Sequence, residues 1–248
     1  MPRLDDSMQS HKIGGSFTFS GARVDRLGSL TYTLVTVAVD ETGSVQGFSD
    51  QLREMLVTAV ESCKKSPRSD NILVRVITFS DKYMNGVNEI HGFKPLAEID
   101  TSSYLTIKPG GSTPLYDACY SAIGSQNVYG KQLVDKDYKC NGIAFIITDG
   151  GENASVATAQ MVADEARKSV SGEILESMIS VLIGINGSSY SSWLSKFQKE
   201  AGLTQYIDAG DATPRKLAKL AAFVSKSVSS QSQALGTGGP SQNISATI

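Results

Sequence analysis

Oxygen-bearing side chains gather at three places along this sequence, and their types suit the binding of a metal cation. Asp40, Thr42 and Ser44 follow an apolar run in the segment DETGS, and Asp149 follows another apolar run in TDGGEN. A third segment, GGSTPLY, carries Thr113 just before a predicted helix. The spacing of the first three residues lets a tight turn aim them at one point, and the glycine among them relieves backbone strain in that turn.

Two carboxylates and three hydroxyls, without any Cys or His, describe a site for a hard divalent cation. Mg²⁺ takes oxygen ligands in near-octahedral geometry and usually keeps several waters. The hydroxyls of Thr42, Ser44 and Thr113 can bind such an ion directly, while Asp40 and Asp149 supply the countercharge directly or through water. Helix caps and turns use the same residue types, so each segment alone is a weak signal. All three segments together predict a metal site.

The sequence between these segments alternates strand-like and helix-like stretches, which determines where the segments lie. Apolar runs predict buried strands at 30–39, 72–79, 143–148 and 178–185, with shorter strands at 86–93 and 205–208. Apolar residues at helical spacing predict helices at 48–64, 114–123, 156–169, 191–200 and 213–228. Strands that alternate with helices in this way form parallel βαβ units with right-handed crossovers.

The predicted fold is therefore α/β: a Rossmann-like, open, doubly wound and mostly parallel sheet of about six strands, with helices on both faces. In such a sheet, ligands bind outside the carboxyl ends of the strands, where the strand order reverses. We expect the three oxygen-rich segments to meet in one crevice at that end. Trp193, Leu194 and Phe197 are expected to belong to the core.

With these motifs in this order, the chain resembles the von Willebrand factor A (vWA) domain family over roughly residues 30–228. The signature of that family is the metal-ion-dependent adhesion site (MIDAS): D-x-[ST]-x-S after the first strand, a Thr in a Gly-rich loop, and an Asp in a [ST]-D-G segment after the fourth strand. DETGS, GGSTPLYDA and IITDGGEN look like that signature, with Thr in DETGS where Ser is more usual. The resemblance implies a complete MIDAS, and the metal ligands that match it are Asp40, Thr42, Ser44, Thr113 and Asp149.

By this resemblance the protein is a binding module and not an enzyme. A Mg²⁺ ion, or Mn²⁺ or Ca²⁺ in its place, would keep one coordination position open for a Glu or Asp side chain of a partner protein. Intracellular members of the family often serve with AAA-type ATPases or in multi-protein complexes. The resemblance therefore implies a partner of that kind within an intracellular complex.

A Mg²⁺-dependent phosphohydrolase of the haloacid dehalogenase type is the alternative, with Asp40 as nucleophile and Asp149 holding the metal. Those enzymes place D-x-D at the end of the first strand, whereas this chain has Thr42 at the position of the second Asp. No Lys stands in a matching loop after the middle strands. The sequence therefore favours the binding module.

Composition limits the class of protein further. The 248 residues carry 23 Lys and Arg against 25 Asp and Glu, a formal net charge of -2, so no concentrated basic surface is expected for nucleic acid. The longest apolar runs are far shorter than the ~20 residues of a membrane span, and the N-terminus has no hydrophobic stretch typical of a signal peptide. We therefore expect a cytoplasmic protein without a membrane or nucleic-acid partner.

The ends of the chain differ in composition from its middle. Residues 1–28 are mostly polar, with alternation in Phe17–Val24 that predicts an N-terminal lead-in with one edge strand. Residues 29–228 form the predicted vWA domain. Residues 229–248 contain Ser, Gln, Gly and Ala without any charge, and they are predicted to form a flexible tail.

Overall fold

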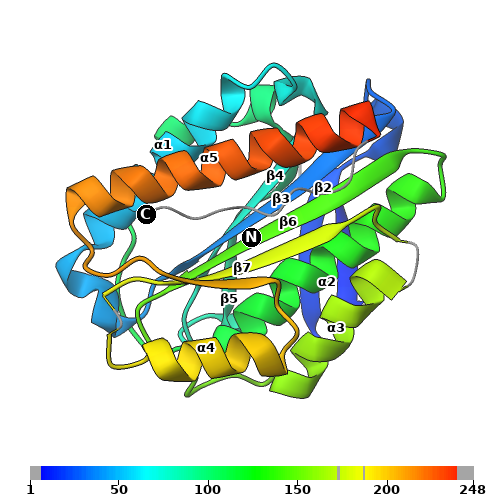
Figure 1. The fold of residues 1–248 in the computed structure, drawn as a ribbon. Coiled ribbons are helices and arrows are strands. Elements are labelled where there is room, and N and C mark those ends of the chain that lie inside the picture. Colours follow the sequence, from blue (N-terminus) through cyan, green and yellow to red (C-terminus); the bar gives the residue numbers. More distant parts are fainter. Residues whose placement is uncertain (1–6, 172–173, 187, 239–248) are drawn as a thin grey trace.

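The computed structural model describes residues 7–171, 174–186 and 188–238, and these build a single mixed sheet between two layers of helices (Figure 1). The strands are β1 (Met8–Gly14), β2 (Phe17–Ala22), β3 (Thr31–Asp40), β4 (Ile72–Phe79), β5 (Val87–Pro95), β6 (Lys139–Thr148), β7 (Met178–Gly184) and β8 (Gln205–Asp208). The long helices are α1 (Ser49–Lys64), α2 (Leu115–Val134), α3 (Ala159–Ser171), α4 (Ser191–Glu200) and α5 (Pro214–Thr237).

The eight strands lie in the order β1-β2-β5-β4-β3-β6-β7-β8. Five neighbouring strands, β4, β3, β6, β7 and β8, run parallel to one another. β5 runs antiparallel to β4, and β1 runs antiparallel to β2. From β3 the chain crosses to β4 on one side and later to β6 on the other. The strand order therefore reverses at β3, which is where a doubly wound sheet forms its ligand crevice.

Each face of the central sheet has its own apolar core. Alternate residues of β3, among them Val35, Val37 and Val39, pack with α1 and α5 on one face. On the other face Ala38 packs beneath α2 and α4, and Leu34 lies beneath the later turns of α2. Figure 1 shows α1 and α5 on one side of the sheet and α2, α3 and α4 on the other. The predicted doubly wound α/β fold is confirmed.

The sheet has more strands than the sequence predicts because the N-terminal segment forms a hairpin and not one edge strand. β1 reads MQSHKIG, and its largely exposed, polar residues give no apolar pattern to recognise. It pairs with β2 over most of its length, and His11 stacks on Phe19 with ring centroids 4.9 Å apart. Residues 1–28 therefore extend the sheet of the domain that follows, as far as they are described.

The closing helix is longer than predicted. α5 runs to Thr237, so residues 229–237, expected to belong to a flexible tail, are helical. Gln231, Ser232 and Ala234 are buried on this part of the helix, and the Arg68 guanidinium donates to the hydroxyl of Ser232. Small polar residues can thus continue a helix when one of its faces packs on the domain. The rest of the predicted tail, 239–248, lies outside the described residues.

None of the helices in the described part of the chain combines the length and the apolar character that a membrane span needs. The three cysteines, Cys63, Cys119 and Cys140, are buried and free.

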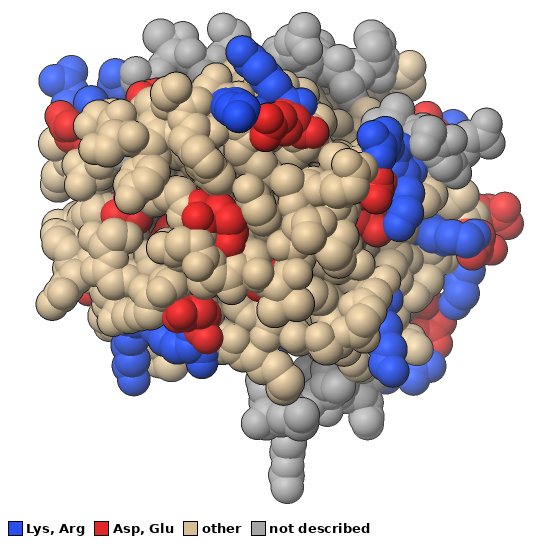
Figure 2. All heavy atoms as spheres, turned by 90° about the horizontal axis from the view of Figure 1, so that it is seen from below, with Lys and Arg blue, Asp and Glu red and all other residues tan. Residues whose placement is uncertain are grey.

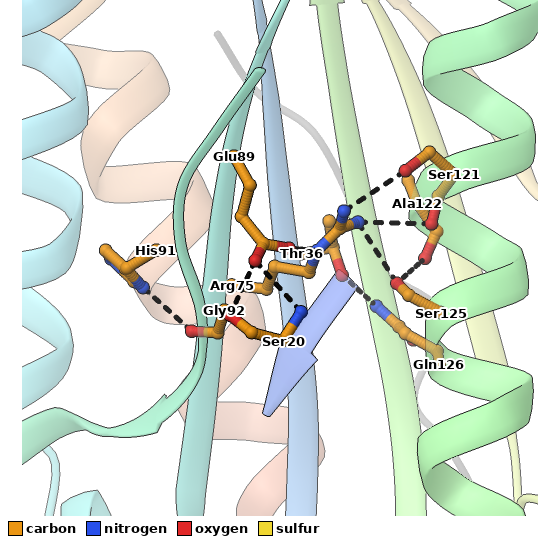
Figure 3. Close-up of polar contacts among 10 residues, drawn as sticks. All are labelled: Ser20, Thr36, Arg75, Glu89, His91, Gly92, Ser121, Ala122, Ser125 and Gln126. Carbon is orange, nitrogen blue, oxygen red and sulfur yellow. Dashed lines mark hydrogen bonds and ion pairs between the residues drawn. The ribbon is translucent and has the colours of Figure 1, made fainter. Parts of the chain in front are cut away.

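The hairpin of β1 and β2 has little backbone pairing with the rest of the sheet, since β2 and β5 pair at the single position Gly21–Phe93. Side chains make much of the connection. The Glu89 carboxylate accepts from the backbone N–H and the hydroxyl of Ser20, at 2.9 and 2.6 Å, and it forms an ion pair with Arg75 Nε at 2.7 Å. Arg75 is fully buried and also donates to Ser121 and Ser125 of α2 (Figure 3). A groove of about 550 Å³ lies where β2 and β5 diverge.

This junction predicts a large loss of stability from Glu89→Ala. The change leaves the buried Arg75 charge without its carboxylate, which costs about 3 kcal/mol, whereas replacing a whole buried pair by apolar side chains is close to neutral. Urea unfolding should therefore show a strong loss for Glu89→Ala and a recovery in the double variant Arg75→Met/Glu89→Leu. A single variant that unfolds within about 0.5 kcal/mol of the wild type would contradict this account.

Candidate metal site

The candidate site lies at the carboxyl ends of β3 and β6, which are neighbours in the sheet. Val39 pairs with Ile147, so the next residue of each strand, Asp40 and Thr148, comes to the same edge. The Thr148 hydroxyl donates to Asp40 Oδ2 at 2.7 Å, and the backbone N–H of Gly150 donates to the same hydroxyl at 3.2 Å. Parallel pairing at the strand-order reversal thus places the first carboxylate.

The turn after β3 directs two hydroxyls toward the second carboxylate. The backbone N–H of Thr42 donates to Asp40 Oδ1 at 2.8 Å, which folds the chain back on itself. The hydroxyls of Thr42 and Ser44 lie 3.0 Å apart, and Ser44 Oγ donates to Asp149 Oδ1 at 2.6 Å. Four of the five predicted site residues are therefore joined by one chain of hydrogen bonds.

Thr113 reaches the same place from the Gly-rich loop that precedes α2. Its hydroxyl lies 3.4 Å from the point that a Cβ atom would occupy at Gly150, the residue after Asp149. The backbone N–H of Thr113 donates to Asn153 Oδ1 at 2.7 Å, and the N–H of Asn153 donates to the Thr113 carbonyl at 3.1 Å. All five residues thus lie at one end of the sheet, as predicted.

Neighbouring loops hold the Gly-rich loop on its other side. The backbone N–H of Gly43 donates to the Gly111 carbonyl, and the N–H of Gly110 donates to the Glu41 carbonyl, each at 3.1 Å. Asp81 accepts from the Ser112 N–H at 2.8 Å, and its own N–H donates to the Ser112 carbonyl at 3.2 Å. The loop is therefore fixed between the turn after β3 and the turn after β4.

The two carboxylates of the site are buried without a basic partner. Asp40 is fully buried, and only 9% of Asp149 is exposed. Burial raises the pKa of Asp40 to about 6; hydrogen bonds from Thr42 and Thr148 lower this pKa, and the charge of Asp149 raises it. Burial also raises the pKa of Asp149, against the hydrogen bond from Ser44. Within the described residues no Lys, Arg or His forms an ion pair with either.

This arrangement fits a hard divalent cation. Two close, buried carboxylates without a basic partner favour a bound positive charge, since ionising both otherwise costs free energy. The surrounding donors are hydroxyl oxygens, which suit Mg²⁺, Mn²⁺ or Ca²⁺ better than softer metals. The described residues contain no group of three or more His, Cys, Asp or Glu side chains placed to hold a metal, so the hydroxyls would have to complete the coordination.

Two further residues, Thr148 and Glu41, shape this site without a signal in the sequence pattern. Thr148 stands in the segment TDGG, but its hydrogen bond to Asp40 depends on the strand register. Glu41 falls out of phase with Asp40 and Thr42 in the sequence, so the spacing does not assign it to the site. Its buried carboxylate instead accepts from the Lys108 N–H and from Lys82 Nζ, each at 3.0 Å, and so helps to hold the Gly-rich loop.

Solved structures of other proteins share this fold. The PilB minor pilin from Streptococcus sanguinis matches with a TM-score of 0.60 at 15% sequence identity, over 88% of this chain and 66% of the pilin chain. The pilus adhesin SpaC from Lactobacillus rhamnosus GG matches with a TM-score of 0.56 at 11% identity, over 92% of this chain and 35% of the adhesin. This chain therefore spans only part of each protein.

Proximal thread matrix protein 1 (PTMP1) from the mussel byssus is a third match, in a structure with a zinc-occupied MIDAS motif. Its TM-score is 0.51 at 16% identity, over 79% of this chain and 46% of PTMP1. No protein-family model matches the sequence. No curated protein sequence matches it either. At these identities the comparisons show the fold alone. The fold of this chain is vWA-like.

The Gly-rich loop predicts different outcomes for two adjacent glycines. Gly111 has φ +78°, and a Cβ atom there would clash with Asp81 Oδ1, whereas no atom comes within 4 Å of a Cβ at Gly110. Gly111→Ala should therefore destabilise the protein by about 1–3 kcal/mol, and Gly110→Ala should change stability little. Urea unfolding of both variants checks this. Equal stability of the two would show that the loop is not fixed as described.

Proposed function

We propose that this protein is a divalent-cation-dependent protein interaction module. The observation that carries the proposal is the pair of buried carboxylates, Asp40 and Asp149, which are linked through Thr42 and Ser44 and lack a basic partner among the described residues. Asp40, Thr42, Ser44, Thr113 and Asp149 would hold a Mg²⁺ ion, with Mn²⁺ or Ca²⁺ as substitutes. The bound ion would supply positive charge that attracts an anionic ligand.

The partner in this proposal presents a Glu or Asp side chain. The five proposed ligands leave at least one position of a near-octahedral ion unfilled. A carboxylate from another protein suits that open coordination position. The names of the structural matches support an adhesive role: two come from pili and one from a byssus matrix. An AAA-type ATPase as partner, and a cytoplasmic complex as setting, stay predictions that need a direct search.

A phosphohydrolase is supported less well. A nucleophilic Asp40 would have to reach a phosphorus atom, but this side chain is fully buried and both of its oxygens accept hydrogen bonds, from Thr42 and Thr148. The residue two positions later is Thr42, whose hydroxyl contacts Ser44. We therefore propose no catalytic role.

The proposed metal site predicts stoichiometric binding of Mg²⁺ or Mn²⁺ that EDTA reverses. Asp40→Asn keeps the shape of the side chain but removes its charge, so it should abolish binding in calorimetry, as should Asp149→Asn. Asp50→Asn, at an exposed position in the first turn of α1, is the matched control and should bind as the wild type does. Zn²⁺ is titrated in parallel because PTMP1 holds zinc in its MIDAS motif. Equal binding by Asp40→Asn and the wild type would refute the assignment.

Metal binding should also raise the melting temperature, Tm, of the wild-type protein. A ligand that binds only the folded state at roughly 100 times its Kd stabilises that state by about 2.7 kcal/mol. Thr113→Ala removes one hydroxyl ligand and should reduce the shift, while Thr113→Ser keeps the hydroxyl and should preserve it. Thermal scans with and without Mg²⁺ make the comparison. A wild-type Tm that does not respond to saturating Mg²⁺ would count against a preformed site.

A further inference from the structure

Aromatic side chains form a platform beside the candidate metal site. Tyr116 of α2 stacks with Trp193 of α4 at a centroid distance of 6.3 Å, and both rings contact Phe197, which is buried beneath them. Tyr190, just before α4, leaves 46% of its surface exposed. Leu194 and Phe197 belong to the core as predicted, but Trp193 is only partly buried. We call Tyr116, Tyr190 and Trp193 the aromatic platform.

Two glycines connect the platform to the site. A Cβ atom at Gly151 would lie 3.0 Å from Tyr190 Cδ1 and 3.6 Å from Trp193 Cε3, so both rings pack directly against this backbone. Gly150 faces the Thr113 hydroxyl in the same way, at 3.4 Å. Asp149 immediately precedes these glycines. The platform therefore packs against the backbone two residues after Asp149, a proposed metal ligand. Neither glycine places a side chain between the platform and the site.

The loop that bears these glycines is held in place. Glu152 accepts from the N–H groups of Ala154 and Ser155, at 2.8 and 2.7 Å, and from the N–H of Tyr116 at 2.9 Å. Asp117 accepts from the N–H of Ala157 at 2.7 Å. The loop after Asp149 and Tyr116 of the platform therefore keep a fixed relation, which lowers the entropic cost of binding a ligand across both.

The aromatic composition of the platform indicates what can bind there. In the view from the side of α4, Lys and Arg lie mainly around the margin, and groups of Asp and Glu lie among uncharged residues nearer the middle (Figure 2). An apolar or aromatic side chain of a partner can stack on Tyr190 and Trp193. The metal site beside it calls for the opposite, a carboxylate.

We infer that the partner segment carries a large apolar or aromatic residue directly next to the acidic residue that reaches the metal. This inference rests on the proposed function and adds the chemistry of the neighbouring position. The carboxylate would bind at the cation, and the adjacent side chain would pack on the aromatic platform. Stacking of one aromatic side chain should strengthen binding roughly three- to tenfold.

Short peptides with blocked ends test this in the presence of Mg²⁺. The probes contain Glu-Phe or Phe-Glu between glycines, with Glu-Gly and Gln-Phe peptides as references. Trp193 is the only tryptophan of the chain, so its fluorescence reports directly on the platform. We expect the Glu-Phe or the Phe-Glu peptide to bind roughly three- to tenfold more tightly than Glu-Gly, and EDTA to abolish binding of each.

Tyr190→Ser separates the two parts of the surface. It should reduce the affinity for the better aromatic peptide to that for Glu-Gly while leaving Mg²⁺ affinity unchanged. Leu30→Ser is the matched control, at an exposed apolar position just before β3 begins and so at the other end of that strand from the site. It should change neither the peptide affinity nor the Mg²⁺ affinity. The inference is overturned if Phe adds no affinity, if Tyr190→Ser has no effect, or if Gln-Phe binds as well as Glu-Phe. If no Glu peptide binds in Mg²⁺, the proposed function itself fails.

Discussion

The burial of two carboxylates at the ends of adjacent strands is the constraint on which the rest of this structure depends. Asp40 and Asp149 are held near each other because β3 and β6 pair in register up to Val39 and Ile147. A charge removed from water needs compensation, and an arginine or lysine would be the usual source. The described structure provides hydroxyls and backbone N–H groups instead. These donors orient the carboxylates without neutralising them, and this is the basis of the proposed cation site.

The sequence predicted the central sheet and the meeting of the oxygen-rich segments at one end of it, because both leave local signals. Buried parallel strands such as ILVRVITF are continuous apolar runs, and DETGS and TDGG stand at the ends of two of them. Knowing that parallel strands end at the same edge is enough to bring Asp40 and Asp149 together. The predicted strand at 72–79 coincides with β4, and the predicted helix at 191–200 coincides with α4.

Other features could not be predicted because they depend on tertiary contacts. β1 is polar, and it becomes a strand because β2 offers it a partner and α2 covers one of its faces. The extension of α5 beyond Val228 likewise depends on burying Gln231 and Ser232. Glu41 has no local signal at all, since its role requires Lys82 and the N–H of Lys108 from distant segments. The partial exposure of Trp193 follows from its position over Phe197, which no pattern of spacing reveals.

Helix α2 couples the site to the frame of the molecule. Its first turn is fixed to the loop after β6, through the bond from Tyr116 N–H to Glu152. Farther along, Ser121 and Ser125 accept from the buried Arg75 of β4, and Gln126 donates to Thr36 of β3 at 3.0 Å (Figure 3). A shift of Thr113 that carried α2 with it would have to break these buried bonds, each of which is costly to leave unmade. The position of Thr113 relative to Asp40 and Asp149 is therefore set by the core of the sheet as well as by the loops at its edge.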